Sequence, residues 1–289
     1  MNSTKGYLLM SGSVVSFAIM SALVKSIPQV DSTVTVFVRF AVGIGILGLL
    51  AITKKIKLTF NRSPLLLLRG FTGGIAVFLL YFSIVKLGVG KATVFVYSYP
   101  IFVTIFSIFF FKEKIKLAQW LFVIMAFFGI ILLSAKEGFD VTQISIYEIL
   151  AILGSLLSAI SIIMVKKLHD SDSSASIFFS QSLIGFWIFI FPANTSSTHG
   201  DINIAIILIA IGVVAAIGQL IMTEAYKYVE ASRGSSMHMM VPVFNIILGY
   251  YLFNEMFSFK EWLGALMVII GCFGVVRTKG IQFKFFGPR

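Results

Sequence analysis

The chain has 289 residues, of which 58% are hydrophobic and 12% are charged, and its formal net charge at pH 7 is +11. Soluble domains contain roughly 45–50% apolar and about 25% charged residues, so this composition excludes a soluble protein and predicts an integral membrane protein. Cys272 is the only cysteine. It cannot form an intrachain disulfide or a CxxC site, and we expect neither a metal nor a cofactor.

Ten apolar segments are long enough to cross a bilayer as helices, which takes roughly 20 residues each. They lie near residues 6–24, 32–52, 65–85, 91–111, 117–135, 146–165, 174–192, 203–226, 232–253 and 260–276. The segments between them are short and hold most of the charged residues, which leaves little chain for a folded soluble domain. The sequence therefore predicts an all-α integral membrane protein with ten transmembrane helices.

The lysines and arginines are distributed unevenly between the two sides of the membrane. With a cytoplasmic N-terminus, sixteen of the 23 fall on the cytoplasmic side and five on the other, while Arg39 and Arg69 lie within spans. Cytoplasmic loops of membrane proteins carry the excess of basic residues, so we expect both termini in the cytoplasm. The same distribution explains the net charge, and we expect no nucleic-acid partner because no basic stripe lies on a soluble face.

The chain repeats itself without a gap at an offset of 142 residues. The residues paired at this offset are Gly12 with Gly154, Ser13 with Ser155, Ser16 with Ser158, Lys25 with Lys167, Gly43 with Gly185, Gly70 with Gly212, Pro100 with Pro242, Glu113 with Glu255, Trp120 with Trp262 and Gly129 with Gly271. Each half holds five spans, and an odd number inverts the second half relative to the first. We predict two inverted five-helix repeats, residues 1–140 and 141–289, an architecture typical of alternating-access transporters.

Each repeat ends in a similar motif. The segments "FKEKIKLAQWLFVIMAFFGIILL" and "FNEMFSFKEWLGALMVIIGCFGVV" share a pattern of Glu, then Trp or Gln, then Gly. With this pattern the chain resembles EamA-type carriers of the drug/metabolite transporter superfamily over nearly its whole length. The resemblance implies a central cavity lined mainly by spans 1, 3, 4, 6, 8 and 9, and transport of small organic metabolites, often amino acids outward. Lys112 and Asn254 stand where the family usually has Gly, so the turn there should be looser.

Two prolines lie near the middle of the membrane, Pro100 in the fourth span and Pro242 in the ninth. Proline interrupts a helix because it lacks an N–H and its ring displaces the carbonyl four residues earlier. Such breaks are tolerated in a membrane where the backbone faces protein or a watery cavity. The prolines are either packing kinks or, as their polar neighbours favour, two gates of a central site. The residues expected to bind substrate there are Tyr81, Ser83, Tyr97, Tyr99, Gln219, Thr223, His238, Met239 and Asn245.

Tyr97 and Tyr99 cannot both face a cavity on an ideal helix, since they stand about 200° apart on it, unless the proline distorts the turn. Arg39 and Glu224 are two further candidates, as charge or proton sites. Arg39 either reaches the outer surface with its long side chain or pairs with a substrate carboxylate or an internal acid. Glu224 either reaches the interface or pairs with Lys227, or it binds an ammonium group or carries a proton.

No catalytic motif competes with a transport function. HExxH, GxSxG and Walker patterns are absent from the sequence, so we do not expect an enzyme. We predict an alternating-access transporter of small amphipathic metabolites, amino acids or related compounds, that works as an exporter and a monomer in a cell membrane, the bacterial inner membrane. The alternatives are a lipid scramblase or flippase-like protein and a structural membrane protein.

Overall fold

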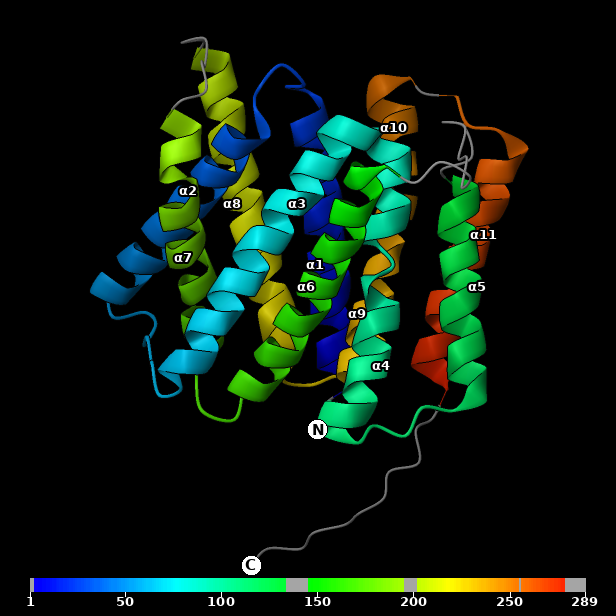
Figure 1. Ribbon diagram of the computed structural model, residues 1–289, viewed down its shortest axis with the longest axis horizontal. Helices are drawn as coiled ribbons and strands as arrows, with labels where there is room; N and C mark the ends of the chain where they lie inside the picture. The colour runs from blue at the N-terminus through cyan, green and yellow to red at the C-terminus, as the bar shows by residue number, and fades with distance from the viewer. Residues whose placement is uncertain (1–2, 134–144, 195–201, 255, 279–289) are drawn as a thin grey trace, which may run out of the picture.

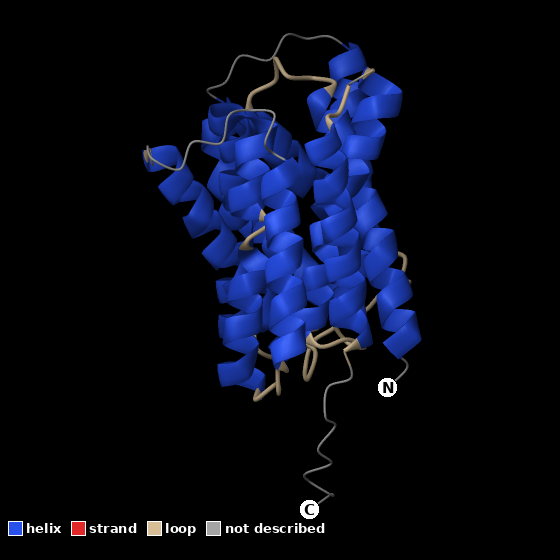
Figure 2. Ribbon diagram, turned by 90° about the vertical axis from the view of Figure 1, so that its right-hand side faces the viewer, coloured by secondary structure: helices blue, strands red, loops and turns tan. Residues whose placement is uncertain are grey.

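The computed structural model describes residues 3–133, 145–194, 202–254 and 256–278. Within them the chain is helical or in connecting loops, and Figures 1 and 2 show the helices running side by side with the loops at the two ends of the bundle. The helices are α1 (Ser3–Lys25), α2 (Ser32–Ile52), α3 (Ser63–Val96), α4 (Tyr99–Phe111), α5 (Leu117–Leu133), α6 (Ile146–Leu168), α7 (Ser174–Asn194), α8 (Ile202–Ala225), α9 (Ala231–Met237), η2 (His238–Met240), α10 (Val241–Phe253) and α11 (Phe259–Arg277).

The membrane-spanning prediction is confirmed, with one difference in the first half. Among the described residues, eight helical spans are long and apolar enough to cross a membrane, and two shorter apolar helices, α4 and α5, complete the set. The predicted loop around residues 86–90 is helical instead, so α3 continues to Val96. The chain nevertheless reverses between the start of α3 and the end of α4, because both points lie at the lower end of the bundle in Figure 1.

The two halves pack as inverted copies of each other. Helix α3 packs against α6 and α7, and the mates of these helices repeat the arrangement, with α8 against α1 and α2. Helix α4 likewise packs against α6, and α10 against α1. The pairs α2 with α7 and α5 with α11 join a helix to its own mate. A two-fold axis in the membrane plane produces this pattern.

Small residues let α5 and α11 cross closely at the edge of the bundle (Figure 1). A Cβ atom built on Gly129 would lie 2.7 Å from the carbonyl oxygen of Gly264. A Cβ on its repeat mate Gly271 would lie 2.7 Å from the carbonyl oxygen of Phe122. Both contacts are with backbone, so the crossing requires glycine at both positions, as is common where membrane helices meet.

The two ends of the bundle hold different connections. The end that holds Ser3 and Arg277, at the bottom of Figure 1, also holds the links of residues 53–62, 112–116, 169–173 and 226–230. We call it the N-terminal end. The opposite end holds the α1–α2 link and the α10–α11 link. The loops of residues 136–144 and 195–201, which should join the other helices there, lie outside the described residues.

The expectation of a looser turn at Lys112 and Asn254 is wrong. These residues end α4 and α10 in the left-handed conformation, with φ of 52° and 51°. The N–H of Lys112 donates to the carbonyl of Ser107, and that of Asn254 to Gly249. The turns are thus tight helix caps of the kind that glycine favours, formed here by a lysine and an asparagine.

We expect Lys112→Gly to stabilise the protein by about 1 kcal/mol, because a residue with a Cβ in the left-handed region costs roughly that amount. The midpoint of thermal unfolding in detergent measures the effect. Lys114→Gly is the comparison, since Lys114 does not have a positive φ. Glycine at this position relieves no backbone strain and adds backbone freedom to the unfolded chain, so it should not raise the midpoint. A lower midpoint for Lys112→Gly than for the unsubstituted protein would contradict this prediction.

Candidate functional site

A cavity of about 620 Å³ lies between the two halves. Its lining extends to the opposite end of the bundle through Pro28, Val30 and Phe257. None of the described link residues at the N-terminal end contributes to it. The cavity therefore connects the middle of the bundle with one end only.

The spans that contain Pro100 and Pro242 are both interrupted at the cavity. Helix α3 ends at Val96 and α4 starts at Tyr99, with Pro100 in its first turn. In the second half, the 3₁₀ turn η2 separates α9 from α10, and Pro242 lies in the first turn of α10. The carbonyl of His238, which proline deprives of its helical donor, accepts the N–H of Val241 instead.

The interruption before Pro100 brings Tyr97 and Tyr99 to the same cavity, although an ideal helix would separate them. Both residues line the cavity, and their ring centroids are 6.3 Å apart. Ser98 between them donates its hydroxyl to the carbonyl of Phe95 at 2.6 Å and contacts Ser155 of α6 at 2.9 Å. These bonds hold the turn that redirects the second tyrosine.

Of the residues predicted for the site, several line the cavity and others do not. The lining includes Tyr81, Tyr97, Tyr99, Gln219, His238, Asn245, Pro242 and Arg39. Ser83, Thr223, Met239 and Pro100 are buried outside it. The Ser83 and Thr223 hydroxyls donate to backbone carbonyls within their own helices, at 2.6 and 2.8 Å. Met239 packs in the apolar cluster between α5, α10 and α11.

Arg39 of α2 points inward and does not reach the surface, since it is only 4% exposed. Its guanidinium donates to the hydroxyl of Tyr81 and to Oε1 of Gln219, both at 3.5 Å. It also lies over the ring of Phe17, 5.8 Å from the centroid. The surface-reaching alternative for this arginine is therefore excluded in this conformation.

Arg69 of α3 is a cavity residue that the sequence analysis did not select. It is 3% exposed, donates to Oε1 of Gln181 at 2.8 Å, and also bonds Ser161. All three side chains line the cavity. The position of Arg69 within a span could have identified it as a site residue, because ionisable residues inside membrane segments usually face a cavity or a partner.

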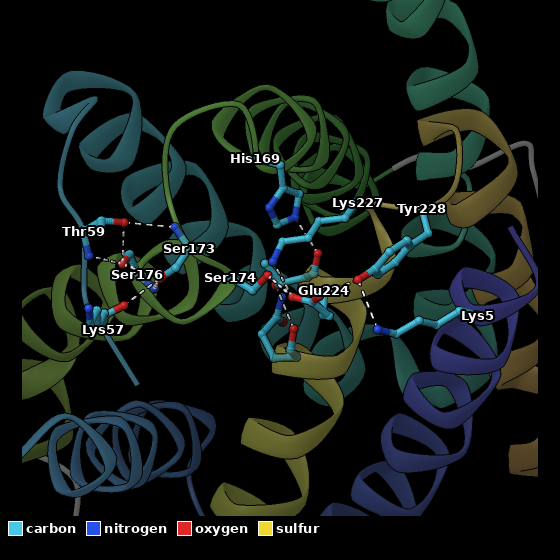
Figure 3. Close-up of polar contacts among 12 residues, drawn as sticks. Lys5, Lys57, Thr59, His169, Ser173, Ser174, Ser176, Glu224, Lys227 and Tyr228 are labelled. Carbon is cyan, nitrogen blue, oxygen red and sulfur yellow. Dashed lines mark hydrogen bonds and ion pairs between the residues drawn. The ribbon is translucent and has the colours of Figure 1, made fainter. Parts of the chain in front are cut away.

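Glu224 lies near the end of α8 at the N-terminal end and does not line the cavity. Figure 3 shows its polar contacts. Its carboxylate pairs with Lys227 at 2.7 Å and accepts the hydroxyls of Ser174 at 2.5 Å and Tyr228 at 3.2 Å. Tyr228 in turn accepts a bond from Lys5 of the first half at 3.2 Å. Of the two alternatives for Glu224, the structure contains the pairing with Lys227.

Polar bonds join the two halves at the N-terminal end, where the cavity stops. Glu113 accepts the N–H of Ala231 at 3.0 Å and the hydroxyl of Ser232 at 2.6 Å. The N–H of Thr59 donates to the hydroxyl of Ser176 at 2.6 Å (Figure 3). Glu113 thus supplies an acceptor at the start of α9, where amide groups have no partner within the helix. Glu255, the repeat mate of Glu113, lies outside the described residues.

His169, at the end of α6, adds a contact within the second half at this end (Figure 3). Its Nε2 lies 2.6 Å from the carbonyl oxygen of Thr223. Burial lowers the pKa of His169 to about 4. The imidazole is neutral at pH 7, and its Nε2 donates to that carbonyl.

These features define the class. Two inverted five-helix repeats that enclose a polar cavity open toward one end form a membrane transporter fold. The chain belongs to the EamA-like transporter family, whose model matches residues 4–135 and 145–277. It is therefore a multi-pass membrane transporter rather than an enzyme, with a small-molecule substrate.

Named relatives are also transporters. The pseudopaline exporter CntI of Pseudomonas aeruginosa is 24% identical over 273 residues, covering 91% of this chain and 93% of that protein. Solute carrier family 35 member G1 of Mus musculus is 28% identical over 75% of this chain and 62% of its own length. The riboflavin transporter of Vibrio cholerae is 26% identical over 59% of this chain and 57% of its own length.

A solved crystal structure has the same fold. It superposes with a TM-score of 0.79 over 94% of this chain and 96% of the other, at 12% sequence identity. The similarity extends over both halves of the chain and concerns the fold alone.

Proposed function

We propose that this protein exports small amphipathic organic metabolites by alternating access, with amino acids and related compounds as the first candidates. It acts as a monomer in a bacterial inner membrane with the N-terminal end in the cytoplasm. One observation carries the mechanism. The cavity between the repeats reaches one end, while packed side chains and bonds between the halves close the other. Rocking the repeats against each other would exchange the open and closed ends.

The cavity wall supports an amphipathic substrate. Tyr97 and Tyr99 supply aromatic faces and hydroxyl groups, and Gln219, His238 and Asn245 supply polar atoms on the other half. The export direction follows the relative named as an exporter. Pro100 and Pro242 are the proposed hinges, because each starts a helix at an interruption beside the cavity.

The function is tested by comparing all detectable metabolites inside and outside cells with and without the protein. Cells that make the protein should accumulate specific small metabolites in the medium. Purified protein in sealed vesicles should then transport these compounds. Transbilayer movement of labelled lipid without solute transport would instead identify a scramblase.

Removing polar groups from the cavity wall should reduce transport while leaving protein levels unchanged. We expect Tyr97→Phe, Tyr99→Phe and Asn245→Ala each to lower the transport rate by about tenfold, the effect of one lost hydrogen bond of roughly 1.4 kcal/mol. Ser83→Ala is the matched control, because Ser83 bonds only within its own helix. Normal rates for all three cavity variants would place the substrate elsewhere.

The proposed orientation predicts which end an impermeant maleimide reaches in intact cells. In a Cys272→Ala background, a cysteine at Gln29, in the exposed α1–α2 link, should react. A cysteine at Lys55, exposed at the N-terminal end, should react only after the membrane is opened. The reverse pattern would invert the orientation and, with it, the side to which the cavity opens.

A further inference from the structure

Two buried arginines from different helices reach the same cavity. Arg39 comes from α2 and Arg69 from α3, and each is less than 5% exposed. A charge taken out of water costs several kcal/mol unless a partner compensates for it. Two such charges in one membrane cavity therefore call for an explanation.

The hydrogen-bond partners of both arginines are neutral. Arg39 bonds the hydroxyl of Tyr81, the sulfur of Met20 and the amide oxygen of Gln219. Arg69 bonds the hydroxyl of Ser161 and the amide oxygen of Gln181. In the part of the chain that the structure describes, neither guanidinium forms an ion pair with a carboxylate.

Glu261 is a carboxylate that lines the cavity, but it bonds Ser258 and neither arginine. Glu261 is 2% exposed, at the start of α11 near the mouth of the cavity. Its Oε2 accepts the N–H and the hydroxyl of Ser258, at 2.6 and 2.8 Å. Glu261 thereby caps its own helix, and the deep part of the cavity keeps an excess of positive charge.

Polar atoms without a partner belong to three residues that line this cavity. Arg69 Nε and Gln219 Nε2 are buried without a hydrogen-bond partner among the described residues. The amide orientation of Gln219 is set by its bond to Arg39, which requires the oxygen on that side. Asn245 Oδ1 is an unpaired acceptor on α10. A buried donor without an acceptor costs about 1–3 kcal/mol, and a bound oxyanion would remove that cost.

Gly73 leaves room for the Arg69 side chain. A Cβ atom on Gly73 would lie 1.9 Å from Arg69 Nη1 and 2.9 Å from both Gln181 Nε2 and Ser161 Oγ. Gly73 follows Arg69 by one helical turn and lines the cavity. The guanidinium thus occupies space that any larger residue at position 73 would take.

We propose that the cavity binds an organic compound through a carboxylate group placed between Arg39 and Arg69. The inference rests on the proposed transport function and narrows its substrate class to carboxylates. Guanidinium groups match the planar geometry of a carboxylate. Bonds within the protein use five of the ten N–H donors of the two arginines, which leaves donors for both oxygens of a carboxylate, the group that the amino acids proposed as substrates carry. The rings of Tyr97, Tyr99 and Phe17 border the rest of the ligand.

The metabolite comparison described above tests the inference by the charge of the compounds it finds. We expect each transported compound to carry a carboxylate. In vesicles, the methyl ester or the amide of such a compound should not compete with its transport. Transported compounds that all lack a carboxylate would overturn the carboxylate assignment and leave the transporter standing. No transported compound at all would overturn the transport proposal, and the inference with it.

Variants test the residues themselves. We expect Arg39→Gln and Arg69→Gln each to lower transport of the carboxylate at least about 30-fold, the effect of truncating one side of a buried charge pair. Gly73→Ala should act like Arg69→Gln although both arginines remain. Arg277→Gln is the matched control, at the exposed end of α11, and should transport normally.

Competition by the ester and the amide uses the unsubstituted protein, so it decides the matter even if a variant fails to fold. Full competition by both the ester and the amide would overturn the proposal. Carboxylate transport that persists in folded Arg39→Gln and Arg69→Gln proteins, with elution and melting like those of Arg277→Gln, would overturn it as well.

Discussion

Replacing Glu113 with Ala should open the N-terminal end of the bundle. The substitution removes two bonds across the halves, from the N–H of Ala231 and the hydroxyl of Ser232. Hydrogen bonds to a charged group contribute about 1.5–3 kcal/mol, and the start of α9 also loses a favourable negative charge. The lower figure for one bond alone corresponds to roughly a tenfold loss of the population advantage of the closed state, and the loss of both bonds to more than that.

Cysteine accessibility measures this opening. Met10 is fully buried in the cluster that closes the N-terminal end, so a cysteine at this position in a Cys272→Ala background should react slowly with maleimide. We expect Glu113→Ala to raise the rate by roughly tenfold or more. Glu230→Gln is the control, because Glu230 pairs with Arg233 three residues away on a partly exposed surface. Equal rates in the Glu113→Ala and Glu230→Gln proteins would contradict a role of Glu113 in closure.

The second large effect is expected at the crossing of α5 and α11. A methyl group at Gly129 or Gly271 would press on backbone atoms that cannot turn away, so the helices must separate. Overpacking of this kind costs about 1–3 kcal/mol. Because the two positions are repeat mates in one crossing, we expect Gly129→Ala and Gly271→Ala to lower the midpoint of thermal unfolding by similar amounts.

The chain offers a matched control for this prediction. A Cβ atom on Gly45 or Gly48 of α2 would meet nothing within 4 Å. Gly45→Ala and Gly48→Ala should therefore leave the midpoint unchanged or raise it, since alanine favours a helix more than glycine does. If all four variants behave alike, close approach of α5 and α11 does not limit stability.

The carboxylate inference and the closure at Glu113 concern different parts of one transport cycle. Arg39 and Arg69 lie in the cavity, where binding would take place. Glu113 lies where the halves meet at the closed end. Loss of an arginine should thus weaken binding, whereas loss of Glu113 should change which end is open, and the two defects can be measured separately.

The class, the number of spans and the inverted repeat followed from the sequence. Span length is set by the thickness of the bilayer, and the inversion follows from an odd number of spans in a gapless repeat. Both are properties of the chain itself. The interruptions before Pro100 and Pro242 were also predictable, because proline removes a helical hydrogen bond in any context.

Contacts between distant residues could not be predicted in this way. Arg39 meets Gln219, 180 residues away, and Arg69 meets Gln181, 112 residues away. The helical spacing of residues on α8 also led to a wrong expectation. Gln219 and Thr223 share a face of α8, yet Gln219 lines the cavity while Thr223 bonds its own backbone.

The sequence by itself determined that this protein crosses the membrane ten times as two inverted halves, because hydropathy and residue spacing are fixed along the chain. Only the tertiary structure decided which polar side chains share the cavity. That choice depends on how α2, α3 and α8 pack and on the turn at Tyr97 and Ser98, which brings both tyrosines to one wall. Arg69 became a site residue for the same reason. Its side chain is buried only once the helices have packed, in the space that Gly73 leaves.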